Sequence, residues 1–350
     1  MSLDTVRRGD TVRPGDTAAP GRDLSQVTVR SFDDIEGYEH SMRLATTSMV
    51  VREAPNFSGW HARIDLGQVR LNSAEYSASL STRSNVRWPR FFFLTGGGRP
   101  ARVSGQDFDH GMINYMAEQG AVSMVSDRHM AWTSIEFAPD LLITDFQALH
   151  GRPGSHLTHG AMFGPGDTAA RGRLMDVCRT MLRLGMTDAD GFAPNQAAAG
   201  VLIEAVAACA TNGRHDADRA ASGRHHLILR RMIDAIEGDR HGDLTLAALC
   251  RASNVSAHTL HEVSMNYLGM PPARYLRNHR LRLVHGTLRH ADPGSTSVAA
   301  AMTRHGIWEA VRAASAYQEM FGQLPTDTLN KVARVAVVGN RAVKPARRGA

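Results

Sequence analysis

The sequence predicts an α+β protein of more than one domain, with an N-terminal β-rich barrel carrying two helices and a C-terminal all-α domain carrying two helix-turn-helix motifs. Its 350 residues exceed one ordinary compact domain, and a hydrophobic share of 43% is ample for two cores. Apolar residues alternate with polar ones early in the chain and recur with helical period later. A residue pattern near the C-terminus also occurs twice.

The first segment, residues 1–30, carries Gly, Pro, Asp and Thr without a hydrophobic period, and we expect it to be disordered. It has no apolar core of a signal peptide, and no apolar run approaches the roughly 20 residues of a membrane helix. Cys178, Cys209 and Cys250 are odd in number and widely spaced, which predicts buried thiols in a reducing compartment. We therefore expect a cytoplasmic protein that does not associate with a membrane.

Residues 31–210 are expected to form an effector-binding and dimerisation domain. Ala62, Ile64 and Leu66 alternate with polar residues, and the run 90–94 leads into three glycines, Gly96 to Gly98, that predict a hairpin turn rather than a phosphate loop. Strands of this spacing favour a small barrel or sandwich. Two apolar helices follow, the first with one face built from Leu174, Val177, Cys178, Met181 and Leu182 and the second over 198–210, which suits a connector that also dimerises.

Aromatic residues of the strand-rich region are candidates for a small apolar effector pocket, although core packing is the commoner use of such side chains. These candidates are Trp60, Trp88, Phe91, Phe93 and Trp132. His150, His156 and His159 lie among glycines and a proline, which indicates a loop rather than a metal site. We expect neither metal nor cofactor, and no nucleophile or paired-carboxylate motif has the spacing of an enzyme.

The polar, glycine-bearing residues 211–224 predict a linker, helices follow over 225–330, and residues 331–350 predict a basic flexible tail. The first motif spans about 246–268. Asn254 and Val255 interrupt an apolar helix, and Ser256 is placed to cap the next one. In that second helix Leu260, Val263 and Tyr267 are predicted to point inward, with His258, His261 and Glu262 outward. The pattern indicates a helix-turn-helix whose second helix enters the major groove.

A second copy follows at about 298–321. With a shift of 53 residues, Ala248 falls on Ala301, Arg251 on Arg304, and Gly269 on Gly322. A long arginine-bearing helix over 273–290 joins the copies. Two such hairpins on a rigid helix would set two recognition helices about one DNA turn apart, roughly 34 Å.

Several anchors in this region resemble the DNA-binding domain of the AraC/XylS family over about 90 residues. They are Leu244-Thr245-Leu246, Ser256 with Leu260, the run Gly269-Met270-Pro271-Pro272-Ala273-Arg274-Tyr275-Leu276-Arg277, Gly306-Ile307-Trp308, and Phe321-Gly322 with Pro325. The resemblance implies a transcription regulator that reads two adjacent major-groove segments of double-stranded DNA, with a cupin-like N-terminal domain matched by layout alone. It also implies RNA polymerase, a small-molecule effector and a second copy of the chain as partners.

The chain departs from the family pattern within its recognition helices. Glu262 and Ser264 stand where the family usually has a basic residue and a phenylalanine, and Ala313 and Ser315 are the corresponding departures in the second copy. Loss of a buried phenylalanine costs about 3 to 5 kcal/mol unless the space is refilled, for which Met265, Met302 or Met320 are candidates. No lysine or arginine occurs from Ser256 to Tyr267.

The arginine-poor first recognition helix predicts affinity from phosphate contacts, with modest base discrimination. The predicted DNA-contacting residues are Arg251, Ser256, Ala257, His258, His261, Glu262, Arg274, Arg277, Arg304, Val311, Arg312 and Ser315. A net charge of +6 that comes mostly from arginine suits a polyanionic partner. Two alternatives stay open: a degenerate family member that acts through protein contacts, and a cupin-like enzyme fused to a vestigial helical domain.

Overall fold

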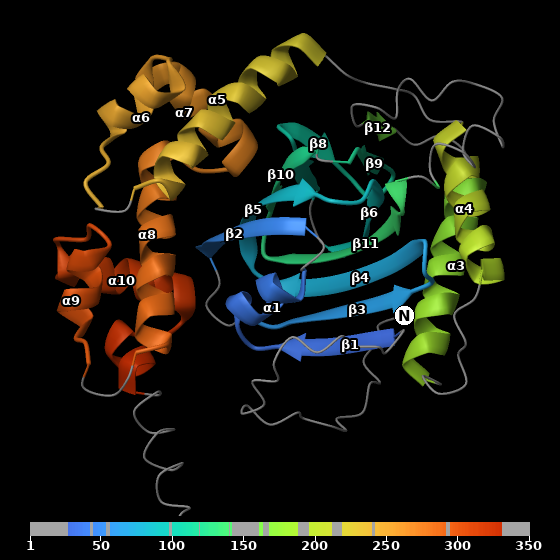
Figure 1. Cartoon of the computed structure of the whole chain (residues 1–350), viewed down its shortest axis with the longest axis horizontal. Helices are drawn as coiled ribbons and strands as arrows, with labels where there is room; N and C mark the ends of the chain where they lie inside the picture. The colour runs from blue at the N-terminus through green and yellow to red at the C-terminus, as the bar shows by residue number, and fades with distance from the viewer. Residues whose placement is uncertain are drawn as a thin grey trace, which may run out of the picture.

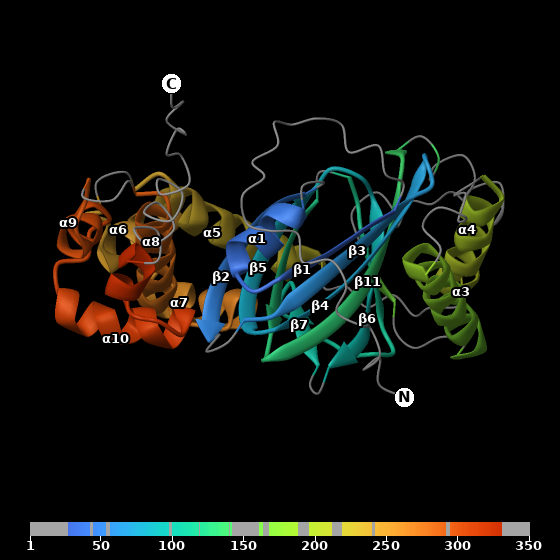
Figure 2. The same cartoon turned by 90° about the horizontal axis from the view of Figure 1, so that it is seen from below.

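The computed structural model describes residues 27–42, 45–53, 57–97, 100–118, 120–139, 141, 161–163, 168–187, 196–211, 219–239, 242–291 and 295–330. Within these ranges the chain forms successive layers: a pair of helices, two β-sheets, and a C-terminal group of helices on the far side (Figures 1 and 2). The predicted fold class, a β-rich N-terminal domain followed by an all-α domain, is confirmed.

The N-terminal layers are two antiparallel sheets. The seven-stranded sheet runs in the order β1 (Val27–Phe32), β3 (Gly59–Asp65), β4 (Val69–Ser77), β11 (His129–Phe137), β6 (Arg90–Gly97), β9 (Ile113–Met116) and β12 (Ala161–Phe163). The five-stranded sheet runs in the order β2 (Ala45–Glu53), β5 (Ser79–Val86), β10 (Ala121–Ser126), β7 (Ala101–Val103) and β8 (Gln106–Phe108). A short helix, α1 (Ile35–Ser41), lies between β1 and β2 in the chain.

Apolar side chains from both sheets fill the space between them. Leu80 from β5, Tyr76 from β4 and Trp132 from β11 are all buried in one cluster, together with Tyr38 of α1. Because successive side chains of a strand point to opposite faces, the seven-stranded sheet also has an apolar outer face. The predicted alternation of Ala62, Ile64 and Leu66 is confirmed by their burial.

The glycine run after 90–94 does not make the predicted hairpin. β6 continues through Gly97, and the next strand, β7, belongs to the other sheet. A Cβ at Gly96 would lie 3.2 Å from that of Ala131, and Gly97 has a φ of +127° beside the backbone of β11. The glycines therefore permit close approach of the neighbouring strand; Gly98 lies outside the described residues.

Two helices cover the outer face of the seven-stranded sheet. They are α3 (Thr168–Thr187) and α4 (Gln196–Thr211). Leu174 and Cys178 of α3 and Leu202 of α4 pack in one cluster with Phe91 and Phe93 of β6. The predicted apolar face of the first helix is confirmed, with Leu174, Cys178 and Met181 buried and Val177 and Leu182 partly buried.

The C-terminal helices are α5 (Arg219–Glu237), α6 (Leu246–Ser253), α7 (Ala257–Leu268), α8 (Pro272–Arg289), α9 (Val298–Arg304) and α10 (Ala310–Phe321). They contain two apolar clusters. Leu229 of α5, Leu249 of α6 and Leu260 of α7 pack together with Val50 of β2. The α8–α10 side chains, among them Tyr317, instead belong to the same cluster as the interior of the barrel.

Several predicted boundaries need correction. Strand β1 begins at Val27, inside the predicted disordered lead, because Val27 and its neighbours pair with β3 up to Ile64. Helix α5 begins at Arg219, inside the predicted linker 211–224. Cys178 and Cys209 are buried, but Cys250 is half-buried. Residues 1–26, 212–218 and 331–350, and the three histidines 150, 156 and 159, lie outside the described residues.

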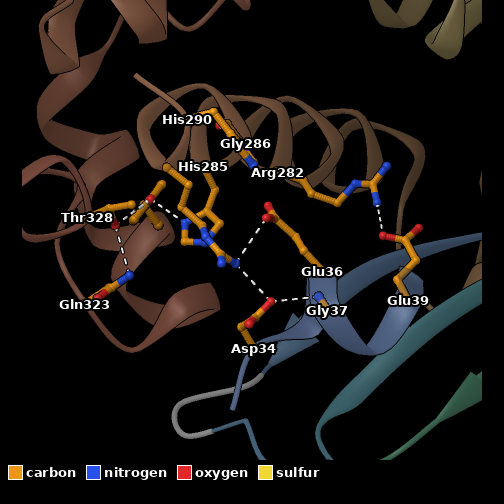
Figure 3. A network of polar contacts seen from close by, with 12 residues as sticks. Asp34, Glu36, Gly37, Glu39, Arg282, His285, Gly286, His290, Gln323 and Thr328 are labelled. Atoms are coloured by element: carbon orange, nitrogen blue, oxygen red, sulfur yellow. Dashed lines mark hydrogen bonds and ion pairs between the residues drawn. The ribbon is translucent and has the colours of Figure 1, made fainter. Parts of the chain in front are cut away.

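Polar contacts join the barrel to the long helix α8 (Figure 3). Arg282 Nη1 lies 2.5 Å from Glu39 Oε2. Arg289 Nη1 donates to Asp34 Oδ1 at 2.9 Å and to Glu36 Oε2 at 3.2 Å. Burial tends to raise the pKa of the Asp34 carboxyl, but the Gly37 amide and Arg289 hold that pKa below its ordinary value. These contacts fix α8 against α1.

Deeper in the same interface, Asn278 Nδ2 donates to the Val51 carbonyl at 2.8 Å. His285 Nδ1 lies 2.5 Å from the Tyr317 hydroxyl, which also contacts Thr328 Oγ1 at 2.8 Å. A chain of polar contacts thus runs from α8 to α10.

Among the helices in the described ranges, none is long and apolar enough to cross a membrane.

Candidate nucleic-acid interface

The two helix-turn-helix motifs are built alike. Thr245 caps α6 by accepting from the Ala248 amide, and Ser297 caps α9 by accepting from the Ala300 amide. Gly269 and Gly322 end α7 and α10 with φ of 66° and 68°, a left-handed conformation that glycine adopts without steric cost. The repeat seen in the sequence is therefore a repeat of backbone geometry.

The start of the second helix differs between the copies. Ser256 accepts from the Thr259 amide at 3.2 Å, as predicted for a capping residue. Glu309 precedes α10 without a side-chain capping bond, and its carboxylate instead lies 3.1 Å from Arg312 Nη1. The orphan amides at the start of α10 are therefore not satisfied by the preceding side chain.

The outer face of α7 is exposed as predicted. Leu260, Val263 and Tyr267 are buried, whereas His258, His261 and Glu262 are exposed. His258 Nε2 lies 3.4 Å from Glu262 Oε1, with side chains 81% and 60% exposed. The imidazole thus faces the only acidic group of this helix.

All predicted DNA-contacting residues whose side chains are described are exposed. Besides the α7 residues above, these are Arg251, Ser256, Ala257, Arg274, Arg277, Arg304, Arg312 and Ser315. The side chain of Val311 lies outside the described set. Arg251 and Arg304 occupy equivalent last turns of α6 and α9, where a positive charge also suits the helix dipole. Arg274 Nη2 lies 3.4 Å from the carbonyl of Arg52, toward the barrel.

The missing phenylalanine of α7 is compensated locally. Ser264 is fully buried, and its hydroxyl donates to the Met270 carbonyl at 2.7 Å. The side chain of Met270 is itself fully buried in the same cluster. Met265 is 38% exposed, so the prediction that it refills the space is wrong. Around Ala313 in the second copy, Met302 and Met320 are buried as that prediction requires.

A buried ion pair fixes the two motifs relative to each other. Arg280 of α8 donates to Asp239 Oδ2 at 2.8 Å, to the Leu244 carbonyl at 3.1 Å and to the Gly306 carbonyl at 3.4 Å. Asp239 Oδ1 accepts from the Gly242 amide at 3.0 Å. One guanidinium therefore links the end of α5, the approach to α6 and the turn of the second motif.

That turn allows no side chain at its centre. Gly306 has a φ of +71°, and a Cβ there would collide with the backbone of Gly242. The backbone contact brings the segment before α6 against the turn between α9 and α10. It explains why the second motif turns at a glycine.

Trp308 is an exposed aromatic residue that we had not predicted as a site residue. It is 72% exposed and lies two residues before α10, while the neighbouring Ile307 packs against the core. Its place in the turn before a recognition helix was the available signal. An exposed indole at this position can pack against a nucleic-acid backbone or a protein partner.

The five aromatic candidates for an effector pocket do not come together. Phe91 and Phe93 lie under α3 and α4, whereas Trp132 lies inside the barrel and donates to the Tyr38 hydroxyl at 3.3 Å. Trp60 Nε1 donates to Glu75 Oε2 at 3.1 Å, and the Trp88 ring lies under the Arg70 guanidinium. Within the described residues, Phe91 and Phe93 thus lie in a different apolar cluster from Trp132.

Comparison with known proteins agrees with the geometry of the motifs. Residues 249–331 match the family model described as a helix-turn-helix domain. The chain is 32% identical over 105 residues to the probable thc operon regulatory protein of Rhodococcus erythropolis, covering 30% of this chain and 32% of that protein. It is 27% identical over 101 residues to a XylDLEGF operon transcriptional activator of Pseudomonas putida, covering 29% of this chain and 30% of that protein. The match thus spans about a third of these relatives' length.

Solved structures were also compared. A probable AraC family transcriptional regulator from Rhodopseudomonas palustris aligns with 25% identity over 30% of this chain and 96% of its own, with a TM-score of 0.28. ToxT from Vibrio cholerae aligns with 10% identity over 76% of this chain and 98% of its own, with a TM-score of 0.29.

The two capped hairpins on a shared long helix define the class of helix-turn-helix DNA-binding domains. Within that class, residues 249–331 are similar to the helix-turn-helix domain of AraC/XylS-type regulators. The resemblance drawn from the sequence is therefore confirmed for this region, and its relatives are regulators rather than enzymes.

Proposed function

We propose that the chain is a transcription regulator that binds double-stranded DNA in the cytoplasm through both helix-turn-helix motifs. The observation that carries the proposal is the matched pair of hairpins, each presenting an exposed helix beside an exposed arginine, Arg251 or Arg304. Arginines at the ends of α6 and α9 suit phosphates on either side of two successive major-groove segments. The N-terminal domain, residues 31–210, would supply the effector or dimerisation signal.

Affinity would come mainly from the DNA backbone. On α7 the exposed Glu262 is offset only by histidines, and on α10 Arg312 is held by Glu309. Base discrimination by a recognition helix normally uses arginine, asparagine or glutamine. The exposed residues of α7 offer Asn266 alone among these, so modest sequence preference is expected.

The test is fluorescence anisotropy of the full chain on its own upstream DNA and on scrambled DNA, across a salt series. We expect tighter binding to the native DNA and a steep salt slope. Arg251→Gln and Arg304→Gln should each weaken binding on both DNAs and reduce the slope by about one. Arg179→Gln, an exposed change on α3, is the matched control and should leave both values unchanged.

A second candidate is a degenerate regulator that acts through protein contacts, with RNA polymerase or another copy of the chain as partner. The acidic face of α7 and the exposed Trp308 favour it. Equal, weak binding to native and scrambled DNA, unaffected by the two arginine changes, would support this candidate over the first.

A further inference from the structure

A cavity of about 390 Å³ lies where α5 meets the outer face of the five-stranded sheet. Its walls come from β5, β10 and α5, so it is formed by the barrel and the helical domain together. The volume falls in the range of roughly 300–1,000 Å³ typical of small-molecule sites. The lining residues are Arg83, Ala121, Val122, Ser123, Gly223, His226, Leu227, Leu229 and Arg230.

The polar side chains of this cavity are Arg83, Arg230, Ser123 and His226. Arg83 and Arg230 supply two guanidinium groups, and no carboxylate is among the described residues that line the cavity. Arg83 is half-buried, and its guanidinium makes no hydrogen bond or ion pair with the described part of the chain. A half-buried guanidinium facing a cavity without a carboxylate favours an anionic occupant.

The Ser123 hydroxyl gives an independent indication. Ser123 is 2% exposed, and its Oγ is buried without a hydrogen-bond partner among the described residues. Ser123 is also the direct cross-strand neighbour of Arg83, so their side chains lie on one face of the sheet. A buried hydroxyl without a partner costs free energy that a ligand oxygen would recover.

The other side chains that line the cavity are mostly apolar: Ala121 comes from β10, and Leu227 and Leu229 come from α5, beside His226. Val122 contributes backbone, because its side chain packs toward the barrel interior. A ligand therefore needs an apolar body as well as a charged group. The chemistry that fits is a small organic acid, with its carboxylate bound by the Arg83 fork and its hydrocarbon part between strand and helix.

We propose that this cavity binds a small apolar carboxylate, held by Arg83, Arg230 and Ser123. The ligand bridges the barrel and α5. Leu229 also belongs to the apolar cluster of the first motif, so the bound ligand stabilises the docking of that motif on the barrel. The binding itself is independent of DNA; its consequence for DNA rests on the function proposed above.

The test uses 2-naphthoate as the probe and the full chain, with intrinsic naphthoate fluorescence or calorimetry as the readout. We expect saturable binding with one naphthoate per chain, and much weaker binding of the neutral analogue 2-naphthamide. Arg83→Met should weaken naphthoate binding roughly ten- to a hundredfold, the loss expected for a hydrogen bond to a charged group. Arg231→Met, an exposed change one residue beyond the cavity on α5, is the matched control.

A second variant guards against misfolding of Arg83→Met. Leu227 is 38% exposed, so Leu227→Trp fills the cavity mouth without entering the core, and it should abolish binding. Equal affinity for naphthoate and naphthamide, no saturable binding, or unchanged binding in both variants would each overturn the proposal. If the chain binds naphthoate but does not prefer its own upstream DNA, the ligand site is supported and only the proposed DNA-binding function is refuted.

Discussion

The ion pair between Asp239 and Arg280 offers the sharpest test of how the two motifs are held together. The two side chains are 5% and 14% exposed, and their closest atoms lie 2.8 Å apart. Asp239→Asn keeps the shape and the bond from the Gly242 amide but leaves the guanidinium charge without its counterion. Removing one partner of a buried pair typically costs about 3 to 5 kcal/mol. Because Arg280 retains two backbone carbonyls, we expect the lower end, about 3 kcal/mol.

Urea unfolding of the full chain at pH 7 would measure this loss as a shift in midpoint. Asp176→Asn is the matched control, because Asp176 pairs with Arg179 on the surface of α3 with side chains 71% and 67% exposed. Exposed pairs contribute about 0 to 1 kcal/mol. If Asp239→Asn unfolds at the same urea concentration as Asp176→Asn, the assignment of Arg280 as the link between the motifs is refuted.

The same pair predicts a pH dependence. Burial would raise the pKa of the Asp239 carboxyl, but the hydrogen bond and charge of Arg280 hold that pKa below its ordinary value of 3.8. A carboxyl whose pKa is lower in the folded state stabilises the fold above its unfolded pKa. The difference in unfolding free energy between wild type and Asp239→Asn should therefore have its full value at pH 7 and shrink as the pH falls below about 4.

Two further predictions concern stability. Gly306→Ala should lower the free energy of unfolding by at least about 2 kcal/mol, because it combines a positive φ with a backbone collision. Gly172→Ala, with open space around it in α3, should instead raise the free energy of unfolding by about 0.5–1 kcal/mol. Equal shifts of the thermal melting temperature in the two variants would contradict this expectation. Burial lowers the pKa of His279 to about 4. The unfolded chain then takes up the proton first, so stability should fall from about pH 6.5 toward 4, by roughly 2 kcal/mol at pH 5 for this one histidine. His279→Gln should flatten that slope in pH-dependent melting, and a slope unaffected by His279→Gln would disprove the assignment.

The helix-turn-helix region was predictable because its signals are local. Capping residues, glycine ends and inward apolar positions act within a few residues, so Ser256, Gly269 and Leu260 could be placed from sequence. The repeat then located the second motif. Helix ends over 246–321 agree with the prediction to within a residue or two.

The docking of the two domains was not predictable in the same way. Arg282 was visible in the sequence only as one arginine of a long helix, yet it pairs with Glu39, and Arg289 pairs with Asp34, each across more than 240 residues. Periodicity carries no information about such a distant partner. The aromatic effector candidates are separated for a related reason: Phe91 and Phe93 lie on the face of the sheet under α3 and α4, whereas Trp132 of the neighbouring strand lies on the barrel-interior face.

The apolar cluster shared by the barrel interior and helices α8–α10 limits how freely this protein can be recombined. A chimera that joins these helices to a different N-terminal module would have to cover Leu281, Val284 and Leu288, which are fully buried here. Without a matching surface, such a chimera would expose a hydrophobic patch and would be prone to aggregate. Residues of α1 and α8 are therefore expected to covary. Exchange of the whole N-terminal module should succeed only between chains with the same contacting residues on α1 and α8.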